Sequence, residues 1–219
     1  MRIPSLLFAC ALAGSSPWAQ DDTNPYYLQF GLGTVFSEDA DVGSGFGGTV
    51  GFDPGYSASF VLGRTFELSE RWSWDAQFET LYQRFTVDED DIDAVPGIDP
   101  QSVGDLDVAK SLTFFLNGIL DWHLTRQFRI FGGAGVGWAE TLDYNTWDQG
   151  SFSIADDDGL AFQGRFGFAY DLGGSYDVLI GYRYYRSEAL DIDDLQPPTS
   201  SSEIDIGQHS LEVAFRWGL

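Results

Sequence analysis

The sequence predicts an all-β fold in which eight antiparallel strands run up and down and close into a barrel. Three regularities of the 219-residue chain support this expectation. Eight stretches alternate between bulky apolar residues and small or polar ones, the links between them alternate between long and short, and the bulky set lies on one face of every stretch. Alternation with a period of two is typical of a β-strand, because successive side chains point to opposite faces.

The positions of the strands follow from the alternation. We expect strands over residues 26–36, 56–66, 72–85, 110–122, 127–140, 161–171, 176–185 and 209–219. Each is long enough to cross a bilayer as a tilted strand, which takes roughly 9 to 11 residues. No later stretch approaches the run of about 18 apolar residues that a membrane helix needs. One such strand could equally be an ordinary half-buried strand, so the prediction depends on features that all eight share.

The links between the strands alternate in length. Residues 37–55, 86–109, 141–160 and 186–208 are long, polar and acidic, whereas the stretches ELSER, HLTR and LGGS are typical of tight turns. The long links therefore lie at one end of the strands, and the short links lie at the other end with both termini. Barrels that span outer membranes combine short periplasmic turns with longer external loops. A soluble sandwich has no reason to sort its loops in this way.

The two faces of the strands distinguish a membrane barrel from a soluble one. A soluble barrel of the lipocalin type would hold its large apolar groups inside. Eight strands, however, enclose a space just wide enough for side chains to fill, and the bulky residues of all eight exceed that space. The bulky face therefore points into lipid. The sequence thus predicts an eight-stranded antiparallel up-and-down transmembrane β-barrel, which leaves no unpaired strand edge in hydrocarbon.

Aromatic residues gather at one edge of the lipid-facing surface. The short-turn end carries one on each strand: Tyr26, Phe66, Trp72, Trp122, Phe128, Tyr170, Tyr176 and Trp217. Amphipathic rings favour the membrane interface and form girdles around outer-membrane barrels. The general preference of strands for aromatic residues explains their number but not their gathering at one edge. We therefore expect an aromatic girdle at this end, with the long side chain of Arg64 extending to the same interface.

The N-terminal segment has the features of an export signal. Met1 and Arg2 precede the apolar stretch IPSLLFACALA and the small-residue stretch GSSPWAQ. We therefore expect a signal peptide over residues 1–20 and a barrel domain over residues 21–219. The one cysteine, Cys10, lies in this segment, either as an ordinary residue of the signal or as a lipid-attachment site. Cleavage near residue 20 would leave a mature chain without thiol or disulfide chemistry.

The chain is strongly acidic, with a formal net charge of −23 and a pI near 4.1. A nucleic-acid partner is therefore not expected, because its phosphates would be repelled. The four long links hold 23 of the 34 acidic residues. Their stretches VDEDDIDAVPGIDP and LDIDDL are similar to carboxylate clusters that bind hard cations, without the spacing of a calcium loop. We expect either diffuse attraction of Ca²⁺ or Mg²⁺ there or only a solvated acidic surface.

Several stretches resemble the small eight-stranded outer-membrane β-barrels of Gram-negative bacteria, the OmpA-like and opacity-type group. They are GFDPGYSASFVLGRTF, RIFGGAGVGWAE, LAFQGRFGFAYDL, VLIGYRYY and the terminal HSLEVAFRWGL. The resemblance covers nearly all of the expected mature chain. It implies an outer-membrane location and a last strand that the barrel-assembly machinery recognises, with Phe215, Trp217 and Leu219 as the assembly signal. Members usually end in an aromatic residue, so Leu219 departs from the pattern. We expect no peptidoglycan-binding domain after the barrel.

Charged residues of both signs have the parity of the barrel interior. They are Asp75, Glu79, Arg129, Arg165, Arg183, Glu212 and Arg216. Pairing among opposite charges would make their burial tolerable. The sequence therefore predicts a structural plug in the lumen. The alternative is a gated ion path that opens when the pairs exchange partners.

Three cations lie on lipid-facing positions where strands meet the long links. They are Arg84, Lys110 and Arg186. At that level the outer leaflet presents phosphate groups, so we expect contact with outer-membrane lipid and lipopolysaccharide. The alternative is that these residues are ordinary flanking charges.

An enzyme is the least favoured interpretation. The only histidines are His123 and His209. A nucleophile needs a base within hydrogen-bond reach, yet His209 and Ser210 are strand neighbours that face opposite sides. In lipid A deacylase barrels, by contrast, His and Ser share one face. We therefore predict a monomeric, non-enzymatic barrel with a structural or surface-interaction role and with no catalytic, cofactor-binding or metal site. The alternatives are an adhesin that binds a basic or cation-bridged partner, a small gated pore, and a lipid A-modifying hydrolase.

Overall fold

The computed structural model describes residues 24–38, 40–42, 48–50, 52–87, 109–143, 158–192 and 202–219. Eight long strands lie in these ranges: β1 (Tyr26–Ser37), β4 (Phe52–Ser69), β5 (Trp72–Val87), β6 (Ala109–His123), β7 (Phe128–Asp143), β8 (Asp158–Gly173), β9 (Tyr176–Ile192) and β10 (Ser202–Gly218). None of the described residues belongs to a helix long and apolar enough to cross a membrane. The expected signal peptide, residues 1–20, lies outside the described residues.

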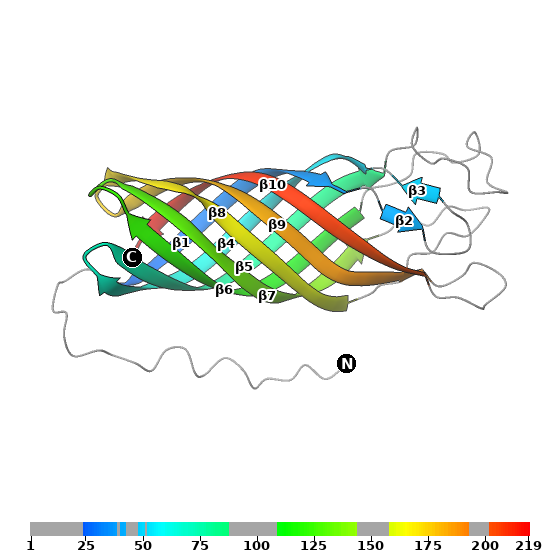
Figure 1. The fold of residues 1–219 in the computed structure, drawn as a ribbon, viewed down its shortest axis with the longest axis horizontal. Helices are drawn as coiled ribbons and strands as arrows, with labels where there is room; N and C mark the ends of the chain where they lie inside the picture. The colour runs from blue at the N-terminus through cyan, green and yellow to red at the C-terminus, as the bar shows by residue number, and fades with distance from the viewer. Residues whose placement is uncertain are drawn as a thin grey trace.

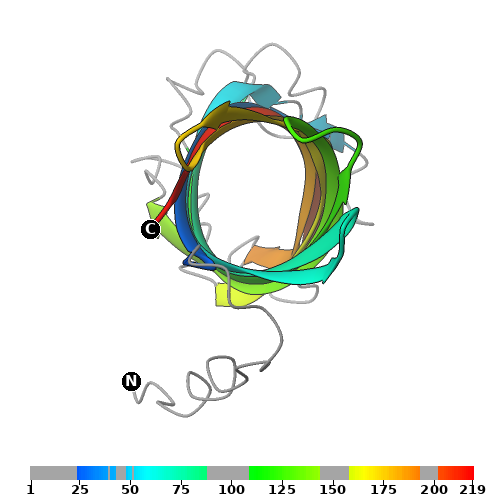
Figure 2. The same cartoon turned by 90° about the vertical axis from the view of Figure 1, so that its left-hand side faces the viewer.

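The eight long strands form one closed antiparallel barrel, in which neighbours in the chain are neighbours in the sheet. Figure 1 shows the strands tilted against the long axis, and Figure 2 shows the ring closed when viewed from one end. β1 and β10 make the closing seam, where Tyr27 pairs with Gly218 and the register continues along both strands. The amide N–H of Leu219 also donates to the carbonyl oxygen of Tyr26 at 2.9 Å. The predicted up-and-down barrel of eight strands is confirmed.

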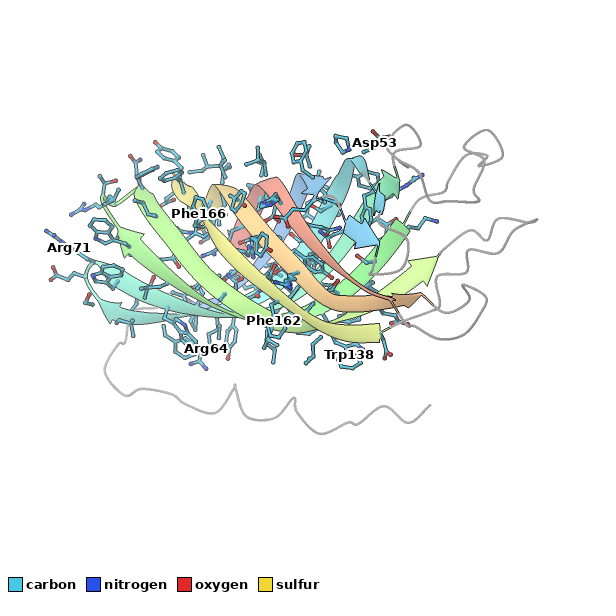
Figure 3. All side chains as sticks on the ribbon, turned by 45° about the vertical axis from the view of Figure 1, so that its right-hand side comes forward. Asp53, Arg64, Arg71, Trp138, Phe162 and Phe166 are labelled. Atoms are coloured by element: carbon cyan, nitrogen blue, oxygen red, sulfur yellow. The ribbon has the colours of Figure 1, made fainter. Side chains whose placement is uncertain are left out.

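Side chains divide between the outer surface and the lumen as the alternation predicts. Leu116 is 61% exposed on the outer wall, whereas Arg183 is fully buried inside. Figure 3 shows Phe166 and Trp138 among the side chains on the outside of the barrel. This distribution is the reverse of that in a soluble protein, in which charged residues are almost never fully buried. It places the apolar side chains where a lipid bilayer would surround them.

The strands are longer than the alternation predicts, and this corrects the expected loop at residues 186–208. β9 and β10 together cover most of that range. Their register shifts between Ile204 and Ile206. β4, β7 and β8 likewise extend into residues 37–55 and 141–160. The apolar pattern stops before the strands do, because beyond the membrane both faces can meet water while the backbone ladder continues.

A small hairpin occupies part of the first expected loop, and no strand was expected there. β2 (Ala40–Val42) pairs with β3 (Gly48–Val50) as a separate two-stranded sheet. Strands this short carry too few residues for a recognisable alternation. The hairpin lies at the end of the barrel opposite the short turns (Figure 1). Of the acidic stretch 86–109, all but residues 86, 87 and 109 lies outside the described residues.

The short turns lie together at one end of the barrel. Arg71 marks this end in Figure 3, and Asp53 marks the opposite end. In the turn between β8 and β9, Gly173, Gly174 and Ser175 have φ angles of 85°, 67° and 75°. Glycine adopts such angles readily because it has no Cβ. The sequence LGGS therefore permits the tight reversal that its composition predicted.

Large inward side chains of the barrel lie over glycines of the next strand. Ile119 of β6 is the register partner of Gly133 in β7, and a Cβ added at Gly133 would lie 2.8 Å from the Ile119 Cδ1 atom. Phe131 of β7 likewise lies over Gly167 of the next strand, β8, and over Gly181 of β9. A barrel of eight strands has little internal width. The glycines therefore provide the space in which the larger side chains pack.

Candidate functional site in the lumen

The middle of the lumen is crossed by four charged side chains, here called the central cluster. They are Glu79 of β5, Arg165 of β8, Arg183 of β9 and Glu212 of β10. The Nη2 atom of Arg183 lies 2.6 Å from Glu79 Oε1 and 2.7 Å from Glu212 Oε1. Arg165 reaches the same two carboxylates, at 3.4 Å each. One guanidinium thus joins opposite parts of the barrel wall across the lumen.

Neutral side chains complete the hydrogen bonds of the central cluster. Glu79 Oε2 accepts from the amide nitrogens of Asn117 and Gln163, each at 2.8 Å. Arg183 donates to Gln163 Oε1 at 2.8 Å. The Ser59 hydroxyl donates to Glu212 Oε1 at 3.1 Å. Two carboxylates and two guanidinium groups make the cluster electrically neutral, and complete pairing of this kind is what makes burial of charge tolerable.

A second group of charges, the short-turn cluster, lies nearer the short-turn end. It consists of Asp75, Asp121, Arg129, Asp177 and Arg216. Arg216 Nη1 lies 3.0 Å from Asp75 Oδ2. Arg129 bridges two carboxylates, at 2.9 Å from Asp121 Oδ1 and 2.6 Å from Asp177 Oδ2. The arginines of this cluster therefore engage three acids from three different strands.

Tyr27 connects the short-turn cluster to the wall. Its hydroxyl donates to Asp75 Oδ2 at 2.8 Å and accepts from Gln77 Nε2 at 2.8 Å. The guanidinium carbon of Arg216 lies 4.0 Å from the centre of the Tyr27 ring, which is a cation–π distance. Tyr27 therefore contacts both members of the Asp75–Arg216 ion pair.

Buried apolar side chains form two sets along the barrel axis, one between the two clusters and one on the loop side of the central cluster. Between the two clusters lies a set that we call the separating layer, formed by Ile119, Phe131, Ala169, Leu179 and Ala214. On the loop side of the central cluster lies the outer layer, formed by Leu81, Phe115, Ala139, Ala161 and Tyr185. Apolar side chains of β6 to β10 thus lie on one side of the central cluster and those of β5 to β9 lie on the other, while Gln77 stands between Asp75 and Glu79 on β5.

All seven lumen charges expected from the sequence lie in one of the two clusters, and every one makes at least one ion pair. Asp121 and Asp177 were not expected, although they carry the same parity as their neighbours and could have been found by extending the alternation to the strand ends. Tyr27 and the amide side chains of Gln77 and Gln163 were also missed. Their parity placed them inside, but no feature of the sequence pairs them with particular charges.

The aromatic residues expected at the girdle all lie at the short-turn end with outward parity. Register partners pair several of them directly, as in Trp72 with Trp122 and Tyr176 with Trp217. The Trp72 and Trp122 rings stack with centroids 5.7 Å apart. The guanidinium carbon of Arg64 lies 4.7 Å from the centre of the Phe66 ring. This contact keeps the aliphatic part of the side chain on the apolar wall, as expected for a snorkelling residue. Contact of this belt with a membrane interface stays a prediction.

The three residues expected to contact lipopolysaccharide do not all lie together. Arg84 and Lys110 are register partners on β5 and β6, so they are neighbours on the outer wall. Arg186 lies on β9, where it pairs with Gly207, farther around the barrel. The guanidinium of Arg84 lies 6.0 Å from the Tyr56 ring. The expected assembly signal is also outward-facing, since Phe215, Trp217 and Leu219 are all exposed.

His209 takes part in a contact that the sequence did not indicate. Its Nε2 atom lies 2.8 Å from Glu38 Oε1, and its Nδ1 atom contacts the Tyr182 hydroxyl. Ser210 faces the lumen and is buried, so it does not share a face with His209. His123 Nε2 lies 3.1 Å from the Ser73 hydroxyl. Within the described residues, no group of three His, Cys, Asp or Glu side chains is placed to hold a metal ion.

The comparisons with known proteins agree with this architecture. A family model described as the outer membrane protein beta-barrel domain matches residues 5–216. Among solved structures, neisserial surface protein A is 15% identical, with 91% of this chain and 100% of that chain covered and a TM-score of 0.49. OprG from Pseudomonas aeruginosa is 16% identical, with 90% and 97% covered and a TM-score of 0.46.

A third solved structure is an enzyme. The outer membrane enzyme PagL is 10% identical, with 87% of this chain and 99% of that chain covered and a TM-score of 0.44. Similarity at this level gives no information about activity. A search of the curated proteins finds no match. Because the family model spans nearly the whole sequence, this chain belongs to the outer-membrane protein β-barrel domain family and is a β-barrel protein of the outer membrane.

Proposed function

We propose that this protein is a non-enzymatic outer-membrane barrel with a closed lumen, which serves envelope structure or surface interaction. The observation that supports a closed lumen is the position of Arg183. It is fully buried, and it pairs with Glu79 and Glu212 across the interior. An ion would have to break these pairs and cross two apolar layers. Leaving a buried charge without its partner costs several kcal/mol, about 3–5 for a broken pair.

The proposal predicts little or no steady conductance. Purified protein inserted into planar lipid bilayers should leave the baseline current unchanged over long recordings. Large, stable channels would refute the closed lumen. Rare, brief openings that depend on voltage would instead favour the gated path, in which the ion pairs exchange partners.

The absence of enzymatic activity is part of the proposal. Two observations support it. His209 and Ser210 face opposite sides of β10, and the hydroxyl that contacts His209 is the phenol of Tyr182. Lipid A should have the same mass spectrum in cells with and without the protein. Loss of an acyl chain that depends on the protein and disappears in Tyr182→Phe would contradict the proposal.

Lipopolysaccharide contact through Arg84, Lys110 and Arg186 is a further part of the proposal. The adjacency of Arg84 and Lys110 supports it, because paired cations match the phosphates of the outer leaflet. Changing all three to Glu should reduce the lipopolysaccharide that co-purifies with the barrel. Arg71→Glu is the control, since Arg71 is an exposed cation at the opposite end. Equal retention in both variants would count against the contact.

We also propose that residues 1–20 direct export and that the last strand guides assembly of a monomer. The exposed row of Phe215, Trp217 and Leu219 supports recognition of β10 by assembly machinery. A folded monomer should migrate faster in an unheated gel sample than in a boiled one.

The acidic links are the part of the chain that we propose for binding an adhesin ligand or divalent cations. Deleting each link in turn and measuring how well cells with the variant bind to surfaces tests this best.

A further inference from the structure

Arg64 is a charged residue on the apolar outer wall of the barrel. The residues that precede it with the same parity on β4, Phe60 and Leu62, are large, apolar and exposed. Figure 3 shows Arg64 on the outside of the barrel, in the half nearer the short turns. The other cations of the described strands lie in the lumen or near the loop end: Arg84, Lys110, Arg129, Arg165, Arg183, Arg186 and Arg216. Arg64 is therefore the one strand cation among them that faces outward at the short-turn end.

Within the described residues, Arg64 has no ion-pair partner. The outward positions around it hold Tyr26 of β1, Ala76 of β5, and Leu62 and Phe66 of β4, so none of them is an acid. Its Nε atom is buried and has no hydrogen-bond partner there. Only Nε is buried in this way, so the two Nη groups are accessible at the outer surface. The charge of Arg64 is thus available to a group outside the described protein.

Two aromatic rings hold the guanidinium group in place. Its carbon lies 5.4 Å from the centre of the Tyr26 ring and 4.7 Å from the centre of the Phe66 ring. The Phe66 ring also contacts the Trp74 ring, with centroids 5.2 Å apart. Aromatic faces attract a guanidinium group but accept none of the hydrogen bonds that its N–H groups make in their own plane. The rings therefore fix the position of the group and leave its donors free.

The level of Arg64 along the barrel indicates what these donors meet. Tyr26, its register partner, and Phe66 belong to the predicted aromatic girdle, which marks a membrane interface. Lipid headgroups with their phosphates lie at that level. Short turns of outer-membrane barrels face the periplasm, where the leaflet consists of phospholipids. A phosphodiester carries one negative charge, and it accepts two parallel hydrogen bonds from a guanidinium group.

The wall beside Arg64 has room for an acyl chain. Toward β6, the register leads from Arg64 to Ala76 and then to Gly118. The three atoms nearest to a Cβ added at Gly118 would all belong to the Trp74 indole, at 3.3–3.8 Å. Two small neighbours keep the outer surface low at this place. The acyl chain of a lipid whose phosphate is bound by Arg64 can therefore lie against the strands.

We propose that Arg64, held between Tyr26 and Phe66, binds the phosphate of a phospholipid in the periplasmic leaflet. One guanidinium group neutralises one phosphodiester, and the aromatic and small apolar residues around it contact the rest of the lipid. The site is independent of the closed lumen and of the lipopolysaccharide contact proposed at the opposite end of the barrel.

Native mass spectrometry of the purified protein in an uncharged maltoside detergent tests the site. Phosphatidylglycerol would be titrated, and the fraction of barrels with one bound lipid would be measured. Arg64→Gln should weaken this binding about tenfold, because it removes hydrogen bonds between charged groups. Phe66→Leu keeps the charge but removes a ring, so about threefold is expected. Arg126→Gln, which removes an exposed cation from a turn at the same end, should bind as the wild type does.

Three results would overturn the site. They are equal affinity in the wild type and Arg64→Gln, an equal loss in Arg126→Gln, and displacement of the lipid by inorganic phosphate at the same concentration. The second would mean unspecific attraction, and the third would mean that free phosphate is the ligand. If Arg64→Gln does not fold, solid-state NMR of the wild type in phosphatidylglycerol vesicles decides. Dephasing of the Arg64 Cζ signal by lipid ³¹P is expected, and its absence refutes the proposal.

Discussion

The central cluster and the short-turn cluster are built from the same residue types but differ in completeness. In the central cluster, Arg183 and Arg165 neutralise Glu79 and Glu212, and amide and hydroxyl groups occupy the remaining oxygens. In the short-turn cluster, carboxylate oxygens of Asp75 and Asp121 stay unpaired. The two clusters also differ in burial, because all four residues of the central cluster are buried, whereas Arg129 and Asp177 of the short-turn cluster are half-buried.

Position along the barrel explains the difference. Apolar side chains lie on both sides of the central cluster, and neither water nor ions can compensate a charge there at low cost. The short-turn cluster has such a layer on one side only and ends beside the turns. A surplus charge can persist there because solvent ions are near. Neutrality is therefore required where the lumen is sealed and relaxed where it opens.

The largest effect should come from removing the shared cation of the central cluster. Arg183→Met leaves Glu79 and Glu212 as neighbouring buried carboxylates, with only the longer Arg165 contacts. We expect a loss of about 3–5 kcal/mol in unfolding free energy. Urea titration of the protein in lipid vesicles measures it. A loss below about 1 kcal/mol would mean that water reaches the central cluster, which contradicts the sealed lumen.

The second-largest loss of unfolding free energy should come from a change in the separating layer. Phe131 packs against Gly167 and Gly181 and stands between the two clusters. Phe131→Ala should cost about 3 kcal/mol through lost burial and the cavity left behind. Phe166→Ala on the outer wall, measured by the same titration, should cost less because lipid can fill the space. Equal costs would show that the separating layer is not tightly packed.

Removal of the Tyr27 hydroxyl should have a smaller effect. Tyr27→Phe removes one of two partners of Asp75 Oδ2, which keeps Arg216, and leaves the buried amide nitrogen of Gln77 without its acceptor, which together should cost about 1.5–2 kcal/mol. Tyr185→Phe removes a hydroxyl whose hydrogen-bond partners, Thr113 and Ser187, are both neutral, so about 1 kcal/mol is expected there. The same unfolding titration compares the two. A larger loss in Tyr185→Phe would invert the expected order.

The smallest effect is expected from neutralising the surplus acid. Asp121→Asn removes a charge that has no full counterpart and should change the unfolding free energy by less than about 1 kcal/mol. Glu79→Gln, the same kind of change in the central cluster, should cost several times more, because it leaves two guanidinium groups facing one carboxylate. Equal losses in the two variants would remove the distinction between the clusters.

Much of this arrangement could be predicted from the sequence because a barrel of eight strands is governed by parity. Alternation placed Arg183 inside and Leu116 outside, and the lengths of the links set the order of the strands. The extensions of β9 and β10 could not be predicted, since Arg186 and Glu188 interrupt the bulky set before Leu190 and Ile192, and Ile204 lies beyond a shift in register. The hairpin of β2 and β3 is too short to show any period.

The pairing inside the lumen was predictable only in part. Parity gathers charges of both signs, but it does not show which acid meets which base across the interior. Arg183 meets Glu79 of β5, four strands away in the barrel, because the tilt of the strands brings these positions to one level. The contact of His209 with Glu38 was hidden for a similar reason, since Glu38 follows the end of β1.

A pair of single cysteines tests the sealed lumen most directly. Ser111 and His123 are inward-facing, half-buried positions on β6 that lie on opposite sides of Asn117, a partner of the central cluster. Ser111→Cys and His123→Cys would be reconstituted separately into oriented vesicles and exposed to a small charged thiol reagent on the loop side. We predict rapid labelling of Ser111→Cys and none of His123→Cys. Labelling of both at similar rates would contradict a lumen closed by the central cluster.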